Sequence, residues 1–376
     1  MDANRKNIPL FSLGSLILLL LIAVGAVAAY FRFAHGLGAS TDLKDNFPWG
    51  LWIGFDVVSG VALAAGGFTI AAATYIFNMK KYKPIARPAI LTAFIGYLMV
   101  IVGLVIDIGQ PTRFWHPFTM WQHRSVLFEV FWCISLYTTV LSLEFAPVVL
   151  ERLGWTKLLK VLKFFTFPLV IAGIILSFLH QSSLGAFFLI APAKLSRLWY
   201  SPIMPQLFFL SAVSLGLATV AFESTVSAAA FKTEPEREII RGLGKGTAIA
   251  LLVYLIVRIA DLLVRGAMPL AFNGSTESKY FLAEIGLGVI LPMVLLFIRQ
   301  VRESTGGSLF SVSVVMAGVI FNRFNVTFFS QTSSGASYLP TWREFAITIG
   351  LISLGIFLYK LAVKLLPILP EVEAEH

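Results

Sequence analysis

Long apolar stretches recur along the whole chain and are separated by short polar connectors. An apolar stretch of about 20 residues forms a helix long enough to cross the hydrocarbon core of a bilayer. Ten such stretches lie at residues 10–34, 49–76, 86–107, 126–150, 161–181, 205–230, 247–265, 280–298, 308–330 and 344–366. Arg323 interrupts the ninth stretch, so this span has the weakest apolar pattern. The pattern therefore predicts about ten transmembrane helices.

The same pattern predicts the fold class and the domain organisation. A membrane barrel needs strands that alternate with period two, whereas these stretches are continuously apolar, as in helices. No window reads as a separate soluble domain, and even the connector at 182–204 is short. We therefore predict an all-α polytopic membrane protein in which residues 1–376 form a single integral membrane domain.

Composition supports a membrane protein and argues against a nucleic-acid partner. The chain is 57% hydrophobic and 13% charged, with a mean hydropathy of +0.83. A soluble core of this length cannot hide so many apolar residues. The net charge of +9 is better explained by loop charges that set the topology than by nucleic-acid binding, because the basic residues flank the apolar stretches.

The basic residues predict the orientation of the chain in the membrane. Eighteen of the 29 Lys and Arg residues lie at connectors that share one face, and nine lie on the opposite face. Since the basic face is the cytoplasmic one and the number of spans is even, both termini are predicted to be cytoplasmic. The first span follows Arg5 and Lys6, and its length favours a retained helix over a cleaved signal peptide.

Tryptophans gather at the outer ends of the predicted spans. They are Trp49, Trp52, Trp115, Trp121, Trp199 and Trp342. Tryptophan rings prefer the boundary between lipid and water. We therefore predict that these residues are interfacial anchors without a chemical role.

Ionisable side chains recur at a common depth near the outer ends of the spans. They are Asp56, Asp107, Glu129, His180, Arg258, Asp261 and Glu284. A charged group at the bilayer centre costs about 2.5–3.5 kcal/mol on insertion scales, so such groups usually face a bundle interior or a water-filled cavity. We therefore expect a polar cavity that opens toward the outer leaflet.

Some of these groups have a structural alternative. Glu129 and Glu284 each lie near the start of a predicted helix, where a carboxylate also interacts favourably with the helix dipole. Arg258 and Asp261 stand three residues apart on one helix, and this spacing favours an ion pair. The sequence leaves both interpretations open for the two glutamates and favours the ion pair for Arg258 and Asp261.

Histidine and cysteine counts limit the cofactors. A haem held between helices needs axial ligands at matching depth, usually two histidines, and His180 is the only histidine well inside a span. His35 lies at a comparable height, but we do not expect a haem. Cys133 is the only cysteine, so the chain forms no disulfide of its own, and we predict no metal site. Any iron–sulfur cluster must belong to a partner.

Without a haem, His180 is available for hydrogen bonding and proton exchange near neutral pH. A quinone needs hydrogen-bonding partners at its carbonyl oxygens and takes up two protons when two electrons reduce it. A histidine, a tyrosine and a carboxylate around an apolar slot meet this need. Tyr97 in "FIGYLMVIVG" is the tyrosine best placed to join His180 and Glu129, although it could equally bond a backbone carbonyl.

Two further carboxylates lie deep in the chain near the cytoplasmic ends of their spans. Glu144 follows Glu129 by fifteen residues, which places it about 22 Å further along the helix. Glu223 has Ser224, Thr225 and Ser227 beside it. These acids either carry protons toward the outer cavity or bind lysines at the cytoplasmic ends of the helices.

Several longer motifs resemble a known family. They are "FPWGLWIGFD" at 47–56, "SVLFE" at 125–129, "LEFAPVVLERLGW" at 143–155, "LHQSSLG" at 179–185 and "LLPILP" at 365–370. These motifs are similar to those of the integral membrane subunit of periplasm-facing NiFe hydrogenases, the HybB type within the broader NrfD/PsrC family. The resemblance covers essentially the whole chain.

The resemblance implies a fold and a function. The fold is two four-helix bundles with two extra helices, in a bacterial inner membrane. The function is that of a quinone-reactive anchor with no prosthetic group, which receives electrons from a ferredoxin-like iron–sulfur subunit on the periplasmic face. The hydrogenase large and small subunits would hold the NiFe centre, so this chain would not itself act on hydrogen. Menaquinone or ubiquinone would be the substrate.

The resemblance also implies site residues. Tyr97, Glu129 and His180 would form the quinone site, with Glu129 as the immediate proton donor. Asp56 and Asp107 would lie nearby and polarise the pocket or supply it with protons, so that Asp56 would belong to the proton path. Related anchors serve molybdopterin, polysulfide and quinol-oxidising complexes, and these remain the main alternative. A secondary transporter is the rival class, but the charged residues here lie toward one face rather than around a midplane site between matching halves.

Overall fold

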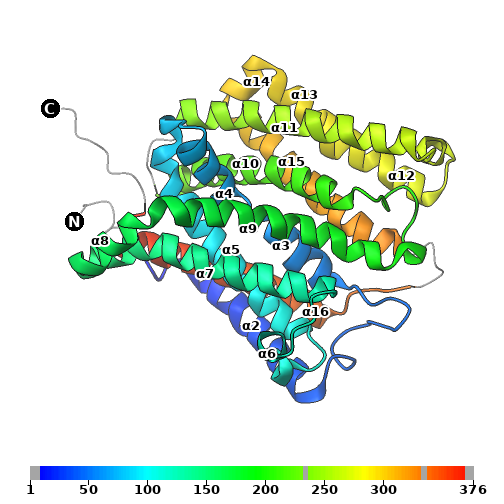
Figure 1. Ribbon diagram of the computed structural model, residues 1–376, viewed down its shortest axis with the longest axis horizontal. Coiled ribbons are helices and arrows are strands. Elements are labelled where there is room, and N and C mark those ends of the chain that lie inside the picture. Colours follow the sequence, from blue (N-terminus) through cyan, green and yellow to red (C-terminus); the bar gives the residue numbers. More distant parts are fainter. Residues whose placement is uncertain (1–8, 232–235, 332–336, 369–376) are drawn as a thin grey trace.

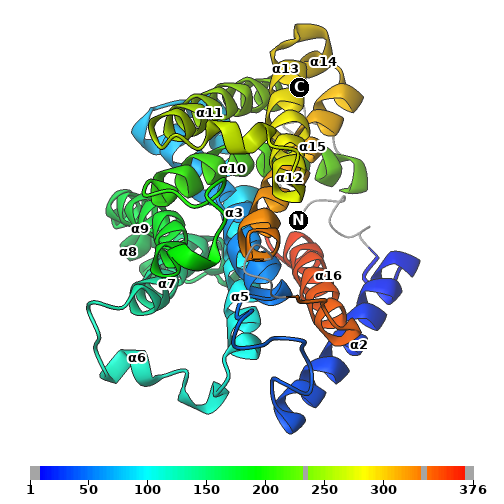
Figure 2. The same cartoon turned by 90° about the vertical axis from the view of Figure 1, so that its right-hand side faces the viewer.

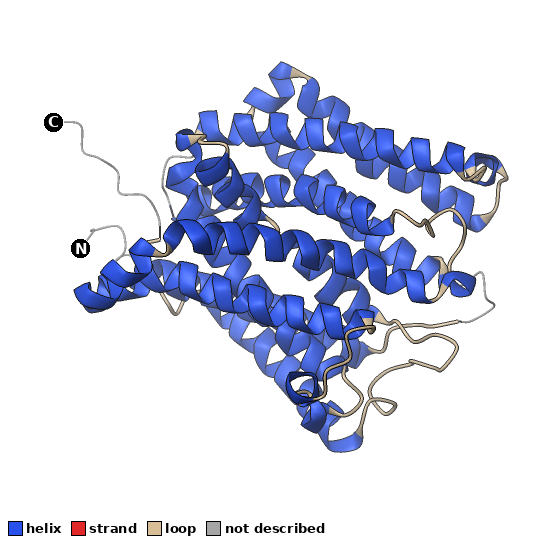
Figure 3. Ribbon diagram, in the orientation of Figure 1, coloured by secondary structure: helices blue, strands red, loops and turns tan. Residues whose placement is uncertain are grey.

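Helices form the fold throughout the described part of the chain. The computed structural model describes residues 9–231, 236–331 and 337–368. Within these ranges the only β-type pairing is an isolated bridge between Lys44 and Phe47, and Figure 3 accordingly contains helices and loops. The predicted all-α class is confirmed.

The number of membrane-spanning helices also agrees with the sequence pattern. Ten segments of the described chain are long and apolar enough to span a bilayer: Leu13–His35, Trp52–Ile76, Lys80–Asp107, Val126–Leu153, Thr166–Ile190, Met204–Phe231, Arg237–Val264, Thr276–Phe297, Thr305–Phe329 and Trp342–Leu365. They run roughly alongside one another in Figure 1. The chain is therefore a multi-pass membrane protein.

The fifth span differs from its predicted position. Residues 161–181 were expected to cross the membrane, but a separate helix, α8 (Thr156–Phe164), precedes the span, and α9 (Thr166–Phe187) begins after it. Helix α8 has no buried residue and carries Lys157, Lys160 and Lys163. A short amphipathic helix of this kind fits the membrane surface rather than its interior.

Eight spans form two rings of four helices. The first bundle contains η1 (Trp52–Ser59), α3 (Gly60–Leu63), α4 (Gly66–Ala71), η2 (Ala72–Ile76), α5 (Ala86–Asp107), α7 (Val126–Leu153) and α9. The second contains α10 (Met204–Phe231), α11 (Arg237–Val264), α12 (Thr276–Ala283), η8 (Glu284–Ile290), α13 (Leu291–Phe297), α15 (Thr305–Phe324) and η9 (Asn325–Phe329).

Packing closes each ring. In the first bundle α4 contacts α5, α5 contacts α7, α7 contacts α9, and α9 contacts α4. In the second bundle α10, α11, α13 and α15 contact one another in the same circular order. Helix α10 joins the bundles by packing on both α9 and α4, as the view along the helices shows (Figure 2).

Helices α2 (Leu13–His35) and α16 (Trp342–Leu365) are the two extra helices and pack on each other beside α5. A Cβ atom added to Gly350 would lie 2.9 Å from the Cα of Gly25. A Cβ on Gly216 of α10 would lie 2.8 Å from the carbonyl carbon of Ala65. Glycine at these positions lets the helix backbones touch, which is a common way to pack helices in a membrane.

The tryptophan prediction is wrong for three of the six residues. Trp52 and Trp199 are each only 1% exposed, and Trp49 is buried as well. The indole N–H groups of Trp52 and Trp199 donate to the Glu344 carbonyl at 3.3 Å and to the Glu284 carboxylate at 2.8 Å. A tryptophan near a helix end is a sequence signal for the interface, but an inward position and a buried acceptor place these two in the core.

Three π-helical segments coincide with polar residues. Asp56 lies in η1, Glu284 begins η8, and Asn325 begins η9. Single turns of π-helix are rare and are frequently found at functional sites. The apolar pattern gave no sign of these segments, because a π turn changes the helical phase without changing hydrophobicity.

We call the end of the molecule that carries α8 the inner end, and the end that carries the connectors 36–51 and 108–125 the outer end (Figure 1). The cytoplasmic location of the inner end stays a prediction. Arg5, Lys6 and Lys232, which support it, lie outside the described residues, as do both chain termini and the last two residues of the "LLPILP" motif.

Candidate functional site

Tyr97 and His180 meet inside the first bundle. They lie on α5 and α9, which are diagonal neighbours in the ring, so both side chains reach its axis. Tyr97 Oη lies 3.0 Å from His180 Nδ1, and both residues are fully buried. The alternative in which Tyr97 bonds a backbone carbonyl is not the arrangement found.

His180 keeps one ring nitrogen free. Its Nε2 atom is buried and has no hydrogen-bond partner among the described residues. Most buried polar side-chain atoms are paired, and an unpaired one calls for a specific explanation. The Tyr97 ring is itself held edge-on against Tyr137, with 4.6 Å between ring centroids, so the pair is fixed in place while Nε2 remains available.

Glu129 joins the same helix through Ser183. The Ser183 hydroxyl donates a short hydrogen bond to Glu129 Oε1, and Ser183 lies one turn beyond His180 on α9. The helix cap of α7 is Ser125 rather than Glu129, and Glu129 is exposed in the first turn of this helix. Glu129 therefore connects the surface of the molecule with the helix that carries His180.

Gln181 and Ser183, which the sequence analysis did not select, support this group. Gln181 donates from Nε2 to the carbonyl of Val61 at 2.9 Å and ties α9 to α3. The Cys133 thiol lies 3.9 Å from the Ser183 hydroxyl. The motif "LHQSSLG" contains both Gln181 and Ser183. The polar residues beside His180 in this motif are the signal that could have identified them.

Asp56 and Asp107 lie in a separate group between α5, η1 and the extra helices. Asp56 is 8% exposed and accepts a hydrogen bond from Thr348 Oγ1 of α16 at 2.7 Å. Arg32 of α2 is buried and donates to the carbonyls of Ile106 and Ile108 at 2.7 and 2.6 Å. It closes the end of α5 and lies within electrostatic range of Asp107.

The two groups occupy different faces of α5. Asp56 packs against Gly103, whose added Cβ atom would lie 3.2 Å from Asp56 Cβ. Gly103 follows Tyr97 by six residues, which is a rotation of about 120° around the helix. Among the described residues no hydrogen bond or ion pair connects Asp56 or Asp107 with Tyr97, Glu129 or His180. The five predicted site residues are thus divided three and two.

Glu144 lies at the inner end of the first bundle and lines a cavity of about 550 Å³. Its carboxylate approaches α9 at Gly173, where an added Cβ atom would lie 3.2 Å from Oε1. Two cationic side chains, Arg87 and Lys163, stand at the same cavity but form ion pairs with Glu151 at 3.0 and 3.2 Å. Glu144 is therefore not the acid that pairs with Arg87 and Lys163 at the inner end.

Glu223 is enclosed between α5, α10 and α16. Thr92 and Tyr359 lie within electrostatic range of it, but neither carboxylate oxygen has a partner at hydrogen-bonding geometry, and the Thr92, Ser227 and Tyr359 hydroxyls are also unpaired. No cationic side chain of the described chain forms an ion pair with it. The expected binding of a lysine is therefore not found for either deep acid.

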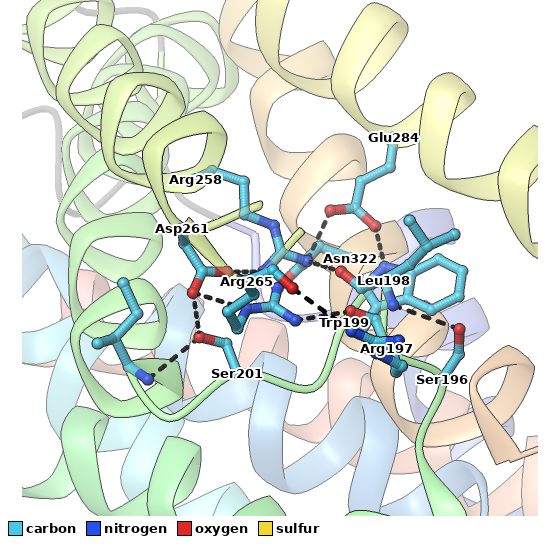
Figure 4. Close-up of polar contacts among 11 residues, drawn as sticks. Ser196, Arg197, Leu198, Trp199, Ser201, Arg258, Asp261, Arg265, Glu284 and Asn322 are labelled. Carbon is cyan, nitrogen blue, oxygen red and sulfur yellow. Dashed lines mark hydrogen bonds and ion pairs between the residues drawn. The ribbon is translucent and has the colours of Figure 1, made fainter. Parts of the chain in front are cut away.

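The second bundle contains its own polar group, centred on Glu284 (Figure 4). Glu284 is 1% exposed and accepts hydrogen bonds from Trp199 Nε1, Asn322 Nδ2 and Asn325 Nδ2 at 2.8, 2.7 and 2.6 Å. It lies eight residues beyond the start of α12, so it is not a helix-start acid. Three donors from other segments satisfy it instead.

Asp261 is held by cations in the same region (Figure 4). Arg265 forms a two-point contact with it at 2.9 and 2.6 Å, and Arg258 lies 3.7 Å away, which confirms the expected pairing of Arg258 with Asp261. Ser201 adds a hydrogen bond at 2.6 Å. Arg323, the residue that interrupts the ninth apolar stretch, is buried and bonds Asn322 Oδ1 and Ser211 Oγ.

The histidines do not converge. His35 is exposed at the end of α2, where it stacks on Phe31 with 4.1 Å between ring centroids and bonds the Phe31 carbonyl. His376 lies outside the described residues. Within the described ranges no group of three or more His, Cys, Asp or Glu side chains could hold a metal ion.

Comparisons with known proteins place the chain among membrane redox subunits. Residues 39–334 match the family model described as "Polysulphide reductase, NrfD". A protein from Nitratidesulfovibrio vulgaris is 38% identical and covers 99% of this chain and 98% of its own length.

Two similar proteins carry descriptive names. The "Probable Ni/Fe-hydrogenase 2 b-type cytochrome subunit" of Escherichia coli is 34% identical over 90% of this chain and 88% of its own length. The "Menaquinone reductase, integral membrane subunit" of Nitratidesulfovibrio vulgaris is 32% identical over 93% of this chain and 90% of its own length. Each match runs through both bundles rather than through one motif.

Proposed function

The chain belongs to the NrfD family of membrane subunits of redox complexes, and from this we propose that it is the quinone-reactive subunit of a hydrogenase-like complex. Electrons would come from an iron–sulfur partner at the outer face. The names of two relatives, a hydrogenase subunit and a menaquinone reductase subunit, support the hydrogenase partner and menaquinone as the substrate.

The observation that carries the proposal is the Tyr97 and His180 pair with its free nitrogen. A hydrogen bond of 3.0 Å orients the imidazole, and His180 Nε2 has no partner among the described residues. An unpaired donor or acceptor in a buried site costs about 1–3 kcal/mol. A quinone carbonyl oxygen would bond this nitrogen and remove that cost.

Reduction of the quinone requires two electrons and two protons, and the three residues divide the work. His180 Nε2 would hold one carbonyl oxygen and transfer a proton to it as charge develops there, because imidazole exchanges protons near neutral pH. Tyr97 would hold the imidazole in position through Nδ1. Glu129, which is exposed and bonded to Ser183, would supply the proton at the side where the quinone enters from lipid.

Asp56 and Asp107 would have a lesser role in this proposal. They were expected beside the quinone, but they lie on another face of α5. Asp56 accepts a hydrogen bond from Thr348, and Asp107 lies near Arg32. Their charges would act on the pocket through the helix rather than by contact. Glu144 would form the inner part of a proton path, and turnover would then move charge across the membrane. Glu223, the other acid predicted for this path, is enclosed beside Thr92 and Tyr359 and would not belong to it.

No electron carrier of this chain is required in the proposal. Cys133 is buried against Ser183, and a cluster needs several thiolates. The iron–sulfur subunit and the hydrogenase large and small subunits would therefore bring the clusters and the NiFe centre. The chain would anchor them to lipid and provide the quinone site.

The test uses the complex purified with its partner subunits from native membranes. We expect Glu129→Gln and His180→Ala to reduce electron transfer from hydrogen to a menaquinone analogue by about 100-fold, the range for loss of a proton-transfer group. Reduction of a soluble dye by hydrogen should stay unchanged, because the dye takes electrons before they reach this chain.

His35→Ala is the matched control, since it removes an exposed histidine at the same end of the molecule. It should leave quinone reduction unchanged. Normal quinone turnover in both Glu129→Gln and His180→Ala would reject the site, and co-purification with partners that lack a hydrogenase centre would assign the anchor to another redox complex.

A further inference from the structure

A cavity of about 550 Å³ lies at the inner end of the first bundle. All four helices of the ring contribute to its wall, through residues such as Tyr75 at the end of η2, Ile90 of α5, Val148 of α7 and Val170 of α9. Lys83 and Lys163 also line the cavity, and both are exposed. The cavity is therefore walled by all four helices of the ring and reaches exposed lysines at the inner end.

Glu144 lines this cavity. Among the described residues it has neither an ion pair nor a hydrogen bond, because Arg87 and Lys163 are both paired with Glu151. The space for its carboxylate exists because residue 173 is glycine: a Cβ atom there would lie 3.2 Å from Glu144 Oε1. An acid without a partner beside a cavity of this size is free to exchange protons with water.

Hydroxyl groups continue from Glu144 along the axis of the bundle. Ser177 follows Gly173 by one helical turn on α9, is fully buried, and its Oγ atom has no hydrogen-bond partner in the described chain. Tyr137 precedes Glu144 by two turns on the same side of α7. Helical side chains lean toward the N-terminus of their helix, so Glu144 leans toward Tyr137.

Tyr137 leads directly to the proposed quinone site. Its ring lies edge-on against Tyr97 at 4.6 Å, and Tyr97 bonds His180. Ser177 lies near both tyrosines, although its hydroxyl makes no hydrogen bond in the described chain. Glu144, Ser177, Tyr137, Tyr97 and His180 thus form one polar series through an otherwise apolar bundle.

We propose that this series is the proton route from the inner side, with the cavity as its entrance. This proposal rests on the proposed quinone site. Glu144 takes a proton from water in the cavity and releases it to the hydroxyls of Ser177 and Tyr137. Each hydroxyl accepts one proton and passes on its own, so that no net charge stays on either. His180 passes one of the two protons of quinone reduction to the oxygen that it holds, and Glu129 supplies the other.

Glu223 is excluded from the route. It lies between α10, α5 and α16, with unpaired hydroxyls of Thr92, Ser227 and Tyr359 around it. It does not line the 550 Å³ cavity. No hydrogen bond of the described chain leads from this enclosed group to Tyr97 or His180.

Chemical rescue tests the entrance. In the complex reconstituted in liposomes, Glu144→Ala should slow quinone reduction about ten-fold and abolish proton uptake from the inner side. Added formate should raise the rate of this variant several-fold, because the cavity admits a small acid to the position of the missing carboxylate. Glu223→Ala is the control, and formate should not change its rate.

Tyr137→Phe tests the inner relay. It should slow quinone reduction and inner-side proton uptake to the same degree, whereas Tyr359→Phe, which removes a buried hydroxyl beside Glu223, should change neither. Full turnover in Glu144→Ala, or rescue of Glu223→Ala instead, would overturn the route. That result would leave the quinone site itself intact if Glu129→Gln and His180→Ala remain inactive, so the two proposals fail separately.

Discussion

The two four-helix bundles each bury a polar group, and the two groups differ in how many of their polar atoms have hydrogen-bond partners. In the second bundle Glu284 accepts hydrogen bonds from Trp199, Asn322 and Asn325 and is sealed from the surface. In the first bundle His180 bonds Tyr97 but Nε2 has no partner among the described residues, and Glu129 is exposed.

This difference separates a structural group from a candidate reactive one. A fully paired buried network stabilises one arrangement of helices, because any change leaves a polar atom without a partner. An unpaired nitrogen beside an exposed acid instead leaves room for a ligand and for proton exchange. Burial of a charge in a membrane helix therefore does not by itself identify a functional site. A buried group whose polar atoms lack hydrogen-bond partners is the better candidate for function.

The largest expected effect is on folding, from Glu284→Ala. The change leaves three buried donors without an acceptor, and each such orphan costs about 1–3 kcal/mol. We expect the apparent melting temperature of the purified chain to fall by on the order of 10 °C, measured by size-exclusion chromatography after heating. Glu277→Ala on the same helix is the control and should change it little, so equal losses would show that Glu284 has no special structural role.

An intermediate effect is expected on activity, from Tyr97→Phe. The ring still packs on Tyr137, so stability should change by only about 1 kcal/mol, the value of one hydrogen bond. Quinone reduction by the purified complex should fall roughly ten-fold, because the imidazole loses the bond that orients it.

Tyr254→Phe removes a buried hydroxyl from the second bundle and serves as the control for this change. Tyr254 is 4% exposed, and its loss should leave quinone reduction unchanged. If both tyrosine variants lost activity equally, the contrast between the bundles would be wrong.

The smallest effect is expected from Thr348→Val. Valine keeps the shape of threonine but cannot donate to Asp56, which now accepts at 2.7 Å. Because Asp56 lies on another face of α5 from Tyr97, quinone reduction should change by less than about two-fold, while stability falls by about 1 kcal/mol. A ten-fold loss of quinone reduction would place Asp56 in direct contact with the substrate after all.

Much of the fold follows from local sequence pattern. All ten spans agree with the apolar stretches to within about ten residues at each end, because hydrophobicity over 20 residues is a local property. The fifth span begins and ends later than predicted because α8, with its three lysines, joins the apolar stretch without a proline or glycine to separate them. The π-helical segments had no sequence signal at all.

Part of the candidate site was also predictable. Helix geometry and depth were enough to select Tyr97, Glu129 and His180, and the structure brings Tyr97 and His180 into contact. The same reasoning grouped Asp56 and Asp107 with them, because depth along the membrane carries no information about which face of a helix meets which neighbour. It also assigned Trp52 and Trp199 to the lipid interface, although each is buried.

The sequence by itself determined how many times the chain crosses the membrane and at what depth each charged residue lies, since both follow from distance along a helix. Only the tertiary structure decided which of these residues are satisfied and which are free. The partners of Glu284 come from a connector and from the segment at Asn322 and Asn325, and the partner of Glu129 comes from α9. Hydrogen bonding between helices depends on the face that packing turns inward, and no single helix contains that information.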